Sequence, residues 1–402
     1  MVIGGGHPQL CLIEAFKQIG CHVTLIDNRD QVPGRRLADN IIKINRYDLD
    51  TILDHARANP PDHIASGGSD KAVYVAAQIA ESFGLPTYVS SKVAALPMQK
   101  AACQELLAAA GVPCPCAVYG TSIHTFEQLD WSRFRFPVVV KPDRGIGQTG
   151  VDRAENLDQA LTSIAAAFAI TENDTVVVQE LVDGNEIGIN GIVLDGAFHL
   201  LTTSYRRSSR RRGGAFGVAM EKVFPAITAP AQLHQLTEII QQACAALNII
   251  SGPIYAQAIV TADHAPELSF SIIEIMPRLG GGEDPRLVVA ATGFDLARAT
   301  ALLWLGRPVD PPTLNDVPVD RAAVLRFLAA DPGRVTTIHG LETARTAHGV
   351  VNAEVFVHAG QLLEPLASSR ERAGYVLTIG PDTTTAANTA HAAANSITIT
   401  TT

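Results

Sequence analysis

The chain has 402 residues, of which 47% are hydrophobic and 18% are charged, and its formal net charge is −9. This composition is typical of a globular protein with two or three domains, and the acidic balance argues against a general nucleic-acid-binding protein. No apolar run reaches the roughly 18 residues that span a bilayer, and the amino terminus lacks the features of a signal peptide. Six cysteines without a CxxC pair fit a reducing compartment. We therefore expect a cytoplasmic protein with no nucleic-acid partner and no membrane partner.

Short strands and helices alternate over the first 92 residues. We expect strands at Met1–Gly6, His22–Ile26, Asn40–Ile44 and His63–Ser66, and helices at 9–19, Leu49–Ala58 and 71–83. This βαβ alternation predicts a parallel, doubly wound, Rossmann-like sheet. Gly4, Gly6 and Asp27 resemble parts of a dinucleotide fingerprint, but Gln9 stands where its third glycine belongs, so the pattern is weak support for NAD.

The stretch 136–151, FPVVVKPDRGIGQTGV, combines a strand with a glycine-rich loop. The β-branched run Val138–Val140 favours a strand, and Lys141 ends it with one ammonium group at the mouth of the loop. The loop contains three glycines, Gly145, Gly147 and Gly150. Glycines let backbone N–H groups approach an anion closely. Two interpretations remain open at this point: a loop that holds a polyphosphate, or an ordinary β-hairpin.

Two other groups of cations lie on either side of this stretch. Lys100 begins an expected helix that ends at Gly111, and it is either a surface lysine or a second cation for phosphates. Five arginines are gathered within 205–214: Arg206, Arg207, Arg210, Arg211 and Arg212. Flanked by serines and glycines, they predict either a solvated loop or a lid that closes over an anionic substrate through bidentate contacts.

Two pairs of strands carry polar residues at positions suited to a ligand. The strand Thr175–Gln179 runs into a turn at 180–186, which is either a plain hairpin or a nucleotide hinge whose backbone pairs with adenine. The strands Tyr255–Thr261 and Ser269–Ile275 should pair antiparallel and place Gln257 beside Glu274. Such a pair suits Mg²⁺, which takes few protein ligands, but it is equally an exposed polar pair on a sheet.

Taken together, four motifs in this order resemble the ATP-grasp superfamily over most of the chain. They are the helix that begins with lysine, FPVVVKP with its loop, the VVVQE hinge and IIEIMPRLGG. Within the superfamily the chain is most similar to carboxylate–amine ligases of the L-amino-acid ligase and carbamoyl-phosphate-synthase-like groups. The resemblance implies an α/β chain in three parts: a Rossmann-like parallel-sheet domain at 1–92, a two-lobed α+β ATP-grasp domain at 93–309, and a small β-rich subdomain at 310–402. The small lobe would cover 93–178 and the larger lobe 179–309, which the carboxy-terminal subdomain would complete.

The resemblance also implies roles for individual residues. ATP would contact Lys100, Lys141, Gly145, Gly147, Gly150, Gln179, Glu180, Val182 and Glu186, with Glu186 on the ribose. Gln257 and Glu274 would hold Mg²⁺ or Mn²⁺, and Arg278, with Lys141, would stabilise the transferred phosphoryl group. The implied reaction activates a small-molecule carboxylate with ATP as an acyl-phosphate and joins it to an amine, releasing ADP and phosphate. A homodimer is compatible with this prediction. A biotin-type carboxylase is disfavoured, because no biotinyl-lysine motif is present.

Two positions depart from the pattern of the superfamily. Met276 stands where the superfamily usually has asparagine, and a thioether is a poor ligand for Mg²⁺. Gln257 replaces the more common acid, although the carbamoyl-phosphate-synthase branch also has glutamine there. A catalytically degenerate ATP-binding protein is therefore the alternative hypothesis.

Overall fold

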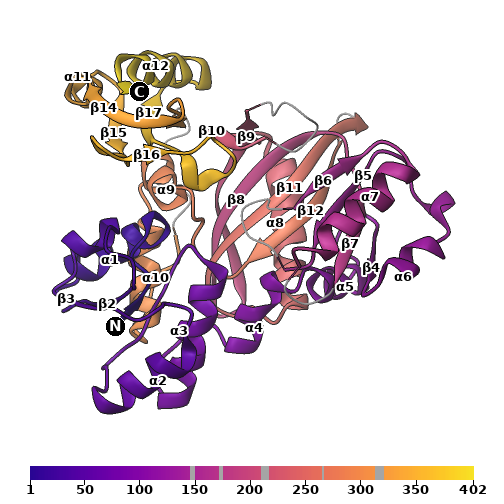
Figure 1. The fold of residues 1–402 in the computed structure, drawn as a ribbon, viewed down its shortest axis with the longest axis horizontal. Coiled ribbons are helices and arrows are strands. Elements are labelled where there is room, and N and C mark those ends of the chain that lie inside the picture. The colour runs from indigo at the N-terminus through magenta and orange to yellow at the C-terminus, as the bar shows by residue number, and fades with distance from the viewer. Residues whose placement is uncertain (145–149, 172–174, 210–216, 265–266, 313–320) are drawn as a thin grey trace.

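The computed structural model describes residues 1–144, 150–171, 175–209, 217–264, 267–312 and 321–402. The small lobe lies at one end of the molecule and the two termini lie toward the other, with a large twisted sheet between them (Figure 1). The amino-terminal sheet is parallel and the other sheets are antiparallel, as the predicted fold class requires.

The amino-terminal region is a three-stranded parallel sheet with helices around it. Its elements are β1 (Val2–Ile3), α1 (His7–Gln18), β2 (Thr24–Ile26), η1 (Pro33–Arg36), β3 (Asn40–Ile42), α2 (Leu49–Ala58), α3 (Asp70–Phe83), α4 (Ser91–Ala95) and η2 (Leu96–Met98). The expected fourth strand at His63–Ser66 is wrong, because only Ala65 forms a bridge, with Val2. The glycines at 67–68 follow immediately and end the pairing after one residue.

The small lobe is a four-stranded antiparallel sheet in the order β4-β7-β5-β6. Its elements are α5 (Lys100–Ala109), β4 (Ala117–Gly120), α6 (Ile123–Glu127), η3 (Trp131–Arg133), β5 (Val138–Pro142), β6 (Asp152–Ala154), α7 (Leu157–Phe168) and β7 (Val176–Glu180). Alternate valines of β5 and β7 point to one face, where they form a buried core with Ala160 and Ile164 of α7.

The larger lobe is an eight-stranded antiparallel sheet in the order β12-β11-β8-β9-β10-β13-β17-β15. The strands are β8 (Asn185–Leu194), β9 (Ala197–Ser208), β10 (Ala219–Phe224), β11 (Gly252–His264), β12 (Glu267–Met276), β13 (Ala322–Leu328), β15 (Val350–Val355) and β17 (Gly374–Gly380). One face of β8 and β11 packs its aliphatic side chains against α8 (Pro230–Ala246). Because strand side chains alternate, the opposite face carries the polar residues of these strands. We call it the front face, and the face that carries α8 and α12 (Thr383–Ser396) the back face.

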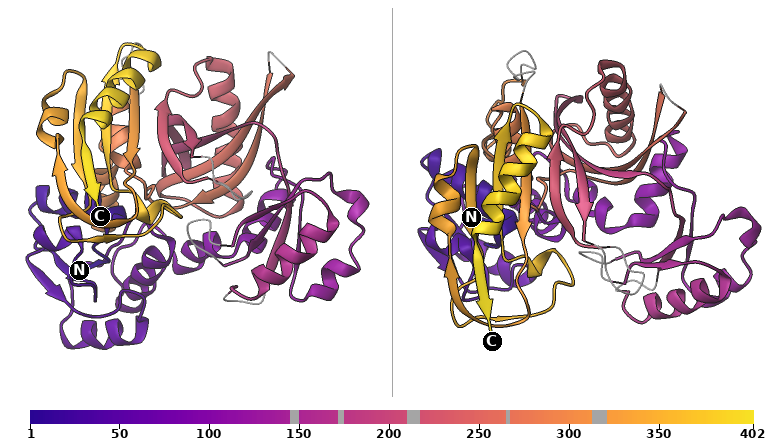
Figure 2. Two further views of the ribbon diagram at one scale, coloured as in Figure 1. Left: turned by 45° about the horizontal axis from the view of Figure 1, so that its top comes forward. Right: turned by 90° about the horizontal axis from the view of Figure 1, so that it is seen from above.

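The carboxy-terminal region lies beside the amino-terminal region (Figure 2), and Arg36 joins the two through an ion pair with Glu354. Its remaining elements are β14 (Gly333–His339), α11 (Leu341–Thr346), β16 (Leu362–Leu363), η5 (Ser369–Glu371) and β18 (Thr398–Thr401). Two helices, α9 (Asp284–Thr292) and α10 (Leu296–Trp304), follow β12 in the larger lobe. No single helix in the described ranges is long and apolar enough to cross a membrane, and α9 and α10, bent by 119°, meet that test only as a pair.

Candidate active site

Two lysines meet where β5 leaves the small sheet. Lys100, at the start of α5, donates a hydrogen bond of 2.7 Å to the carbonyl oxygen of Asp143. The Asp143 carboxylate accepts the backbone N–H of Ala101 at 2.8 Å, so the start of α5 is fixed to the end of β5. Lys141 is buried, and its Nζ donates to Oε1 of Gln179 at 2.7 Å. Burial lowers the pKa of Lys141 to about 8, although the nearby Glu274 carboxylate opposes this shift.

The glycine-rich loop follows Lys141 directly. Gly145 and Gly147 lie outside the described residues, whereas Gly150 has a φ of +72°, which glycine adopts without strain. β5 and β6 pair antiparallel on either side of the loop, with Val138 opposite Ala154. The two interpretations do not exclude each other, because β5 and β6 form the strands of a hairpin whose connecting segment, 145–149, lies outside the described residues.

The predicted hinge connects the small lobe to the large sheet. Gln179 and Glu180 end β7, Val182 lies half-buried in the connection, and Glu186 is on β8. The buried Nε2 of Gln179 has no hydrogen-bond partner within the described residues. A buried donor of this kind costs about 1–3 kcal/mol if it stays unpaired, which favours a ligand or water at this point.

Gln257 and Glu274 lie directly opposite each other on the paired strands β11 and β12, as predicted. Both are half-buried on the front face. The described residues contain no group of three or more His, Cys, Asp or Glu side chains that could hold a metal ion. One carboxylate and one amide oxygen fit Mg²⁺ when phosphate and water supply its remaining ligands, as they commonly do.

Arg278 follows β12 and is clamped by the amino-terminal region. Its Nε and Nη2 donate to the two carboxylate oxygens of Asp70, at 2.7 and 3.0 Å, and its Nη1 donates to the carbonyl of Leu279 at 2.9 Å. The sulfur of Met276 lies 2.8 Å from Nη2 of the same guanidinium. Met276 therefore contacts the arginine rather than presenting a lone pair to a metal beside Glu274.

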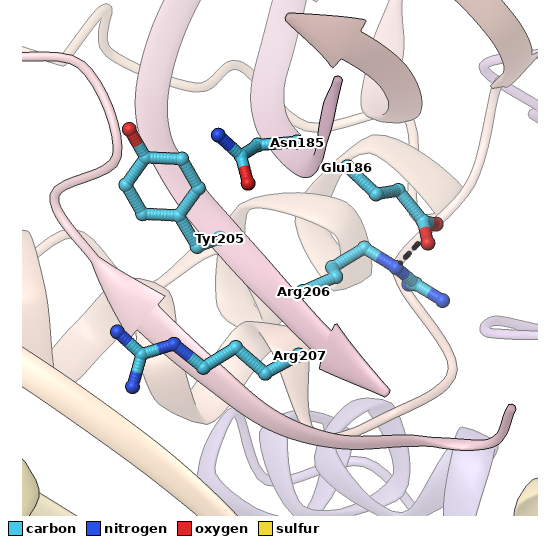
Figure 3. Close-up of a pocket in the computed structure, with 5 residues that line it drawn as sticks. All are labelled: Asn185, Glu186, Tyr205, Arg206 and Arg207. Carbon is cyan, nitrogen blue, oxygen red and sulfur yellow. Dashed lines mark ion pairs between the residues drawn. The ribbon is translucent and has the colours of Figure 1, made fainter. Parts of the chain in front are cut away.

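The first part of the arginine run is strand rather than loop, contrary to our expectation for residues 205–214. Arg206 and Arg207 belong to β9, which extends to Ser208, and Arg210, Arg211 and Arg212 lie outside the described residues. Figure 3 shows the guanidinium groups of Arg206 and Arg207 pointing in opposite directions. Arg206 forms an ion pair of 2.7 Å with Glu186, whereas Arg207 pairs with Glu221 at 3.0 Å. A cavity of about 160 Å³ lies around these residues, lined also by Asn185 and Tyr205.

Two family profiles match the chain. The ATP-grasp domain matches residues 98–282, and the L-amino acid ligase C-terminal domain 2 matches residues 326–402. Dapdiamide A synthase of Enterobacter agglomerans is 28% identical over 307 residues, which cover 72% of this chain and 68% of that protein. The chain thus contains an ATP-grasp domain followed by an L-amino acid ligase C-terminal domain 2.

Two other comparisons extend over nearly the whole chain. An uncharacterized protein of Sinorhizobium fredii is 25% identical over 386 residues, which cover 93% of this chain and 77% of that protein. The L-amino acid ligase from Bacillus licheniformis has a TM-score of 0.82 and 18% identity, covering 100% of this chain and 98% of the other. At that identity the structural likeness shows that the ATP-grasp fold is shared.

A buried cationic cluster lies where the ATP-grasp domain meets the carboxy-terminal region, and sequence reasoning missed its members Lys222, Asp284 and Arg372. Lys222 of β10 lies opposite Arg206 of β9 on the front face. Its Nζ donates to the Asp284 carboxylate at 2.5 Å and to the carbonyl of Gly282 at 2.8 Å. The guanidinium of Arg372 lies 3.7 Å from the centre of the Phe327 ring. Burial lowers the pKa of Lys222 to about 8 and that of Arg372 to about 10.

Unsatisfied atoms within this cluster indicate a place for a ligand. Oδ1 of Asp284 and Nε of Arg372 are buried and have no hydrogen-bond partner within the described residues. A Cβ at Gly282 would lie 3.1 Å from Nζ of Lys222 and 3.3 Å from Nη1 of Arg372, so a side chain there would crowd both cations. The single available signal was an isolated lysine in the run EKVF, which has no distinctive spacing.

Proposed function

We propose that this ATP-grasp protein is a Mg²⁺-dependent ligase that joins a small carboxylate to an amine, with ADP and phosphate as the other products. The observation that carries the proposal is Arg278. It is a buried guanidinium held by both oxygens of Asp70, and it follows the strand on which Glu274 faces Gln257. A fixed cation beside a polar pair suits charge that develops during phosphoryl and acyl transfer.

The nucleotide would lie between the small lobe and the front face. Lys100 and Lys141 would contact its phosphates, and the loop that includes Gly145, Gly147 and Gly150 would cover them. Gln179, Glu180 and Val182 would line the adenine, for which the unpaired Nε2 of Gln179 offers a buried donor. Glu186 would bind the ribose after giving up part of its ion pair with Arg206.

Gln257 and Glu274 would hold Mg²⁺ or Mn²⁺, which would neutralise phosphate charge when bound. The domain boundaries proposed for this arrangement remain 1–92, 93–309 and 310–402.

The proposed chemistry has two steps. A carboxylate oxygen attacks the γ-phosphorus of ATP, the bond to the β–γ bridging oxygen breaks, and ADP leaves. The amine nitrogen then attacks the acyl carbon, phosphate leaves, and the nitrogen loses a proton to form the amide. Arg278 would stabilise the negative charge on the transferred phosphoryl group and on the tetrahedral intermediate. The protein's contribution is orientation and charge neutralisation.

The substrate class follows from the cationic cluster and from the relatives. Lys222, Arg206 and Arg372 would attract an anionic substrate, and the dapdiamide A synthase and L-amino acid ligase likenesses favour amino-acid substrates. We accordingly propose amino acids or related carboxylates as acyl donors and amino acids as amine acceptors, in a cytoplasmic setting.

The proposal is tested by measuring ADP release with Mg²⁺ and ATP against pairs drawn from a panel of amino acids and other carboxylates. We expect ADP release that depends on both substrates and an amide product detectable by mass spectrometry. Folded protein that binds ATP but releases no substrate-stimulated ADP with any pair would overturn it.

A second candidate function, ATP binding without catalysis, is favoured by one observation, the contact between Met276 and Arg278. The variant Met276→Asn restores the usual oxygen donor. ATP binding that is independent of Mg²⁺ in the native chain, with turnover appearing only in this variant, would establish the degenerate protein. Turnover in the native chain would exclude it.

A further inference from the structure

A large cavity lies on the back face of the eight-stranded sheet, on the side opposite Arg206 and Lys222. Its volume is about 700 Å³, and it is bounded by residues of β9, β10, β13 and α12. Strand alternation separates it from the front face, because Arg207 and Glu221 directly adjoin Arg206 and Lys222 in sequence. Cavities of roughly 300–1,000 Å³ are of the size that holds small molecules.

One end of the cavity is lined by a charged cluster around Glu221. This carboxylate is buried and accepts from Nη1 of Arg207 at 3.0 Å, from Nη1 of Arg326 at 3.1 Å, and from Nε2 of His391 at 2.6 Å. Burial alone would raise the pKa of Glu221, but the hydrogen bonds and charges of these partners outweigh burial and lower it. Glu221 therefore stays ionised near neutral pH.

Two guanidinium groups face one carboxylate, so the cluster keeps an excess of positive charge even with His391 neutral. Each guanidinium has five N–H donors, and the hydrogen bonds to Glu221 use one from Arg207 and one from Arg326. Both side chains are partly exposed, at 60% for Arg207 and 34% for Arg326. The cluster thus retains donors for a second carboxylate next to the first.

The rest of the lining is largely apolar. Leu328 of β13 lies on one side, and Ile397 and Ile399 follow α12 on the other. Asn395 lines the cavity from the exposed surface of α12. An anion with an aliphatic tail would satisfy both parts of this lining, whereas inorganic phosphate would satisfy only the charged end.

We infer that this cavity is a second small-molecule site, separate from the proposed catalytic face, which binds a monocarboxylate carrying an aliphatic chain. The carboxylate lies between Arg207 and Arg326, and the chain lies against Leu328 and the two isoleucines. The site does not depend on the proposed ligase reaction, because the ligand contacts the back face and needs no ATP.

The test measures binding of hexanoate to the full-length chain without nucleotide by calorimetry. Asn395→Trp would fill the cavity from its exposed edge, and Ala392→Trp places the same ring at an exposed position of α12 outside the lining. We expect hexanoate to bind one site per chain, Asn395→Trp to weaken it by about tenfold or more, and Ala392→Trp to leave it unchanged. Arg326→Gln should weaken binding about tenfold through loss of a charge-assisted contact.

Two further measurements distinguish this site from the catalytic one and from general apolar binding. Arg278→Met should leave hexanoate affinity unchanged, and 1-hexanol should bind about tenfold more weakly because it lacks the carboxylate. The inference is overturned if Asn395→Trp and Ala392→Trp bind hexanoate equally, if Arg278→Met abolishes binding, or if 1-hexanol binds as well as hexanoate. It is also overturned if inorganic phosphate binds there as tightly. Matching thermal melts of the two tryptophan variants exclude misfolding as the cause.

Discussion

The two faces of β9 and β10 carry the same kinds of charged residue in different environments. On the front face Arg206 and Lys222 lie opposite each other near Glu186 and Asp284, deeply buried, and Asp284 has an oxygen without a partner within the described residues. On the back face Glu221 has three partners, Arg207, Arg326 and His391, and all three retain exposure. The front face is an incomplete electrostatic arrangement that a substrate would complete, whereas on the back face the Glu221 carboxylate already has its hydrogen-bond partners.

The contrast explains why a run of arginines is a poor guide to function. Neighbouring strand residues point to opposite faces, so Arg206 and Arg207 enter different environments although they are adjacent in sequence. A buried arginine with fixed partners can orient a substrate. The ion pair of a half-exposed arginine, by contrast, contributes little free energy. Three expectations test this difference.

The largest effect should come from Arg278. Arg278→Met removes the guanidinium that Asp70 orients, and we expect turnover to fall about 100- to 1,000-fold, as for loss of a fixed donor to developing charge. ATP affinity should change little, because the nucleotide would bind mainly to the small lobe. Single-turnover ADP formation and ATP calorimetry measure the two quantities.

The matched control for that variant is Arg334→Met, which removes an exposed arginine whose Nη1 donates to Gly360. Its turnover should stay within about twofold of the native value. Equal losses in Arg278→Met and Arg334→Met would contradict the role of Arg278.

The paired variants Arg206→Met and Arg207→Met sharpen the comparison of the two faces. Arg206→Met leaves Glu186 and Tyr255 without their buried cation, and we expect kcat/KM to fall about 10- to 100-fold. Arg207→Met leaves Glu221 with Arg326 and His391, so we expect a change of about threefold or less. Steady-state kinetics on both proteins provide the measurement, and a larger loss in Arg207→Met would reverse the assignment of the faces.

The sequence predicts those parts of the fold in which pattern and environment agree. The valine runs of β5 and β7 are buried on one face, and the pairing of Gln257 with Glu274 follows from two apolar strands joined by a short turn. Prediction from the sequence fails for β9 and β10, because polar side chains on the front face obscure the alternation that marks a half-buried strand. The helix α9 was also missed, although Asp284 and Pro285 in its first turn are helix-start signals that follow a glycine-rich turn.

The site was predictable to the extent that it consists of local motifs. Lys141, Gln179 and the strand that leads to Arg278 are each marked by their own stretch of sequence. Asp70 is separated from Arg278 by 208 positions, and it lies at the start of an ordinary amphipathic helix. Tertiary packing alone brings the two together, so no local spacing could identify the pair.

The smallest effect concerns pH and tests whether two buried lysines, Lys141 of the small lobe and Lys222 of the front face, act as cations. The pKa of Lys141 is lowered to about 8 by burial, so its ammonium is present below that pH and is lost as pH rises. If the ammonium binds ATP, kcat/KM for ATP should fall roughly fourfold from pH 7 to 8.5 in the free enzyme. Lys141→Arg should flatten this profile, because arginine stays charged throughout. Lys222 has a similarly lowered pKa. In Lys222→Arg, kcat/KM for ATP should still fall with pH, whereas kcat/KM for the carboxylate substrate should become independent of pH. If the pH dependence of kcat/KM for ATP disappears in Lys222→Arg and not in Lys141→Arg, the group that titrates is Lys222 rather than Lys141.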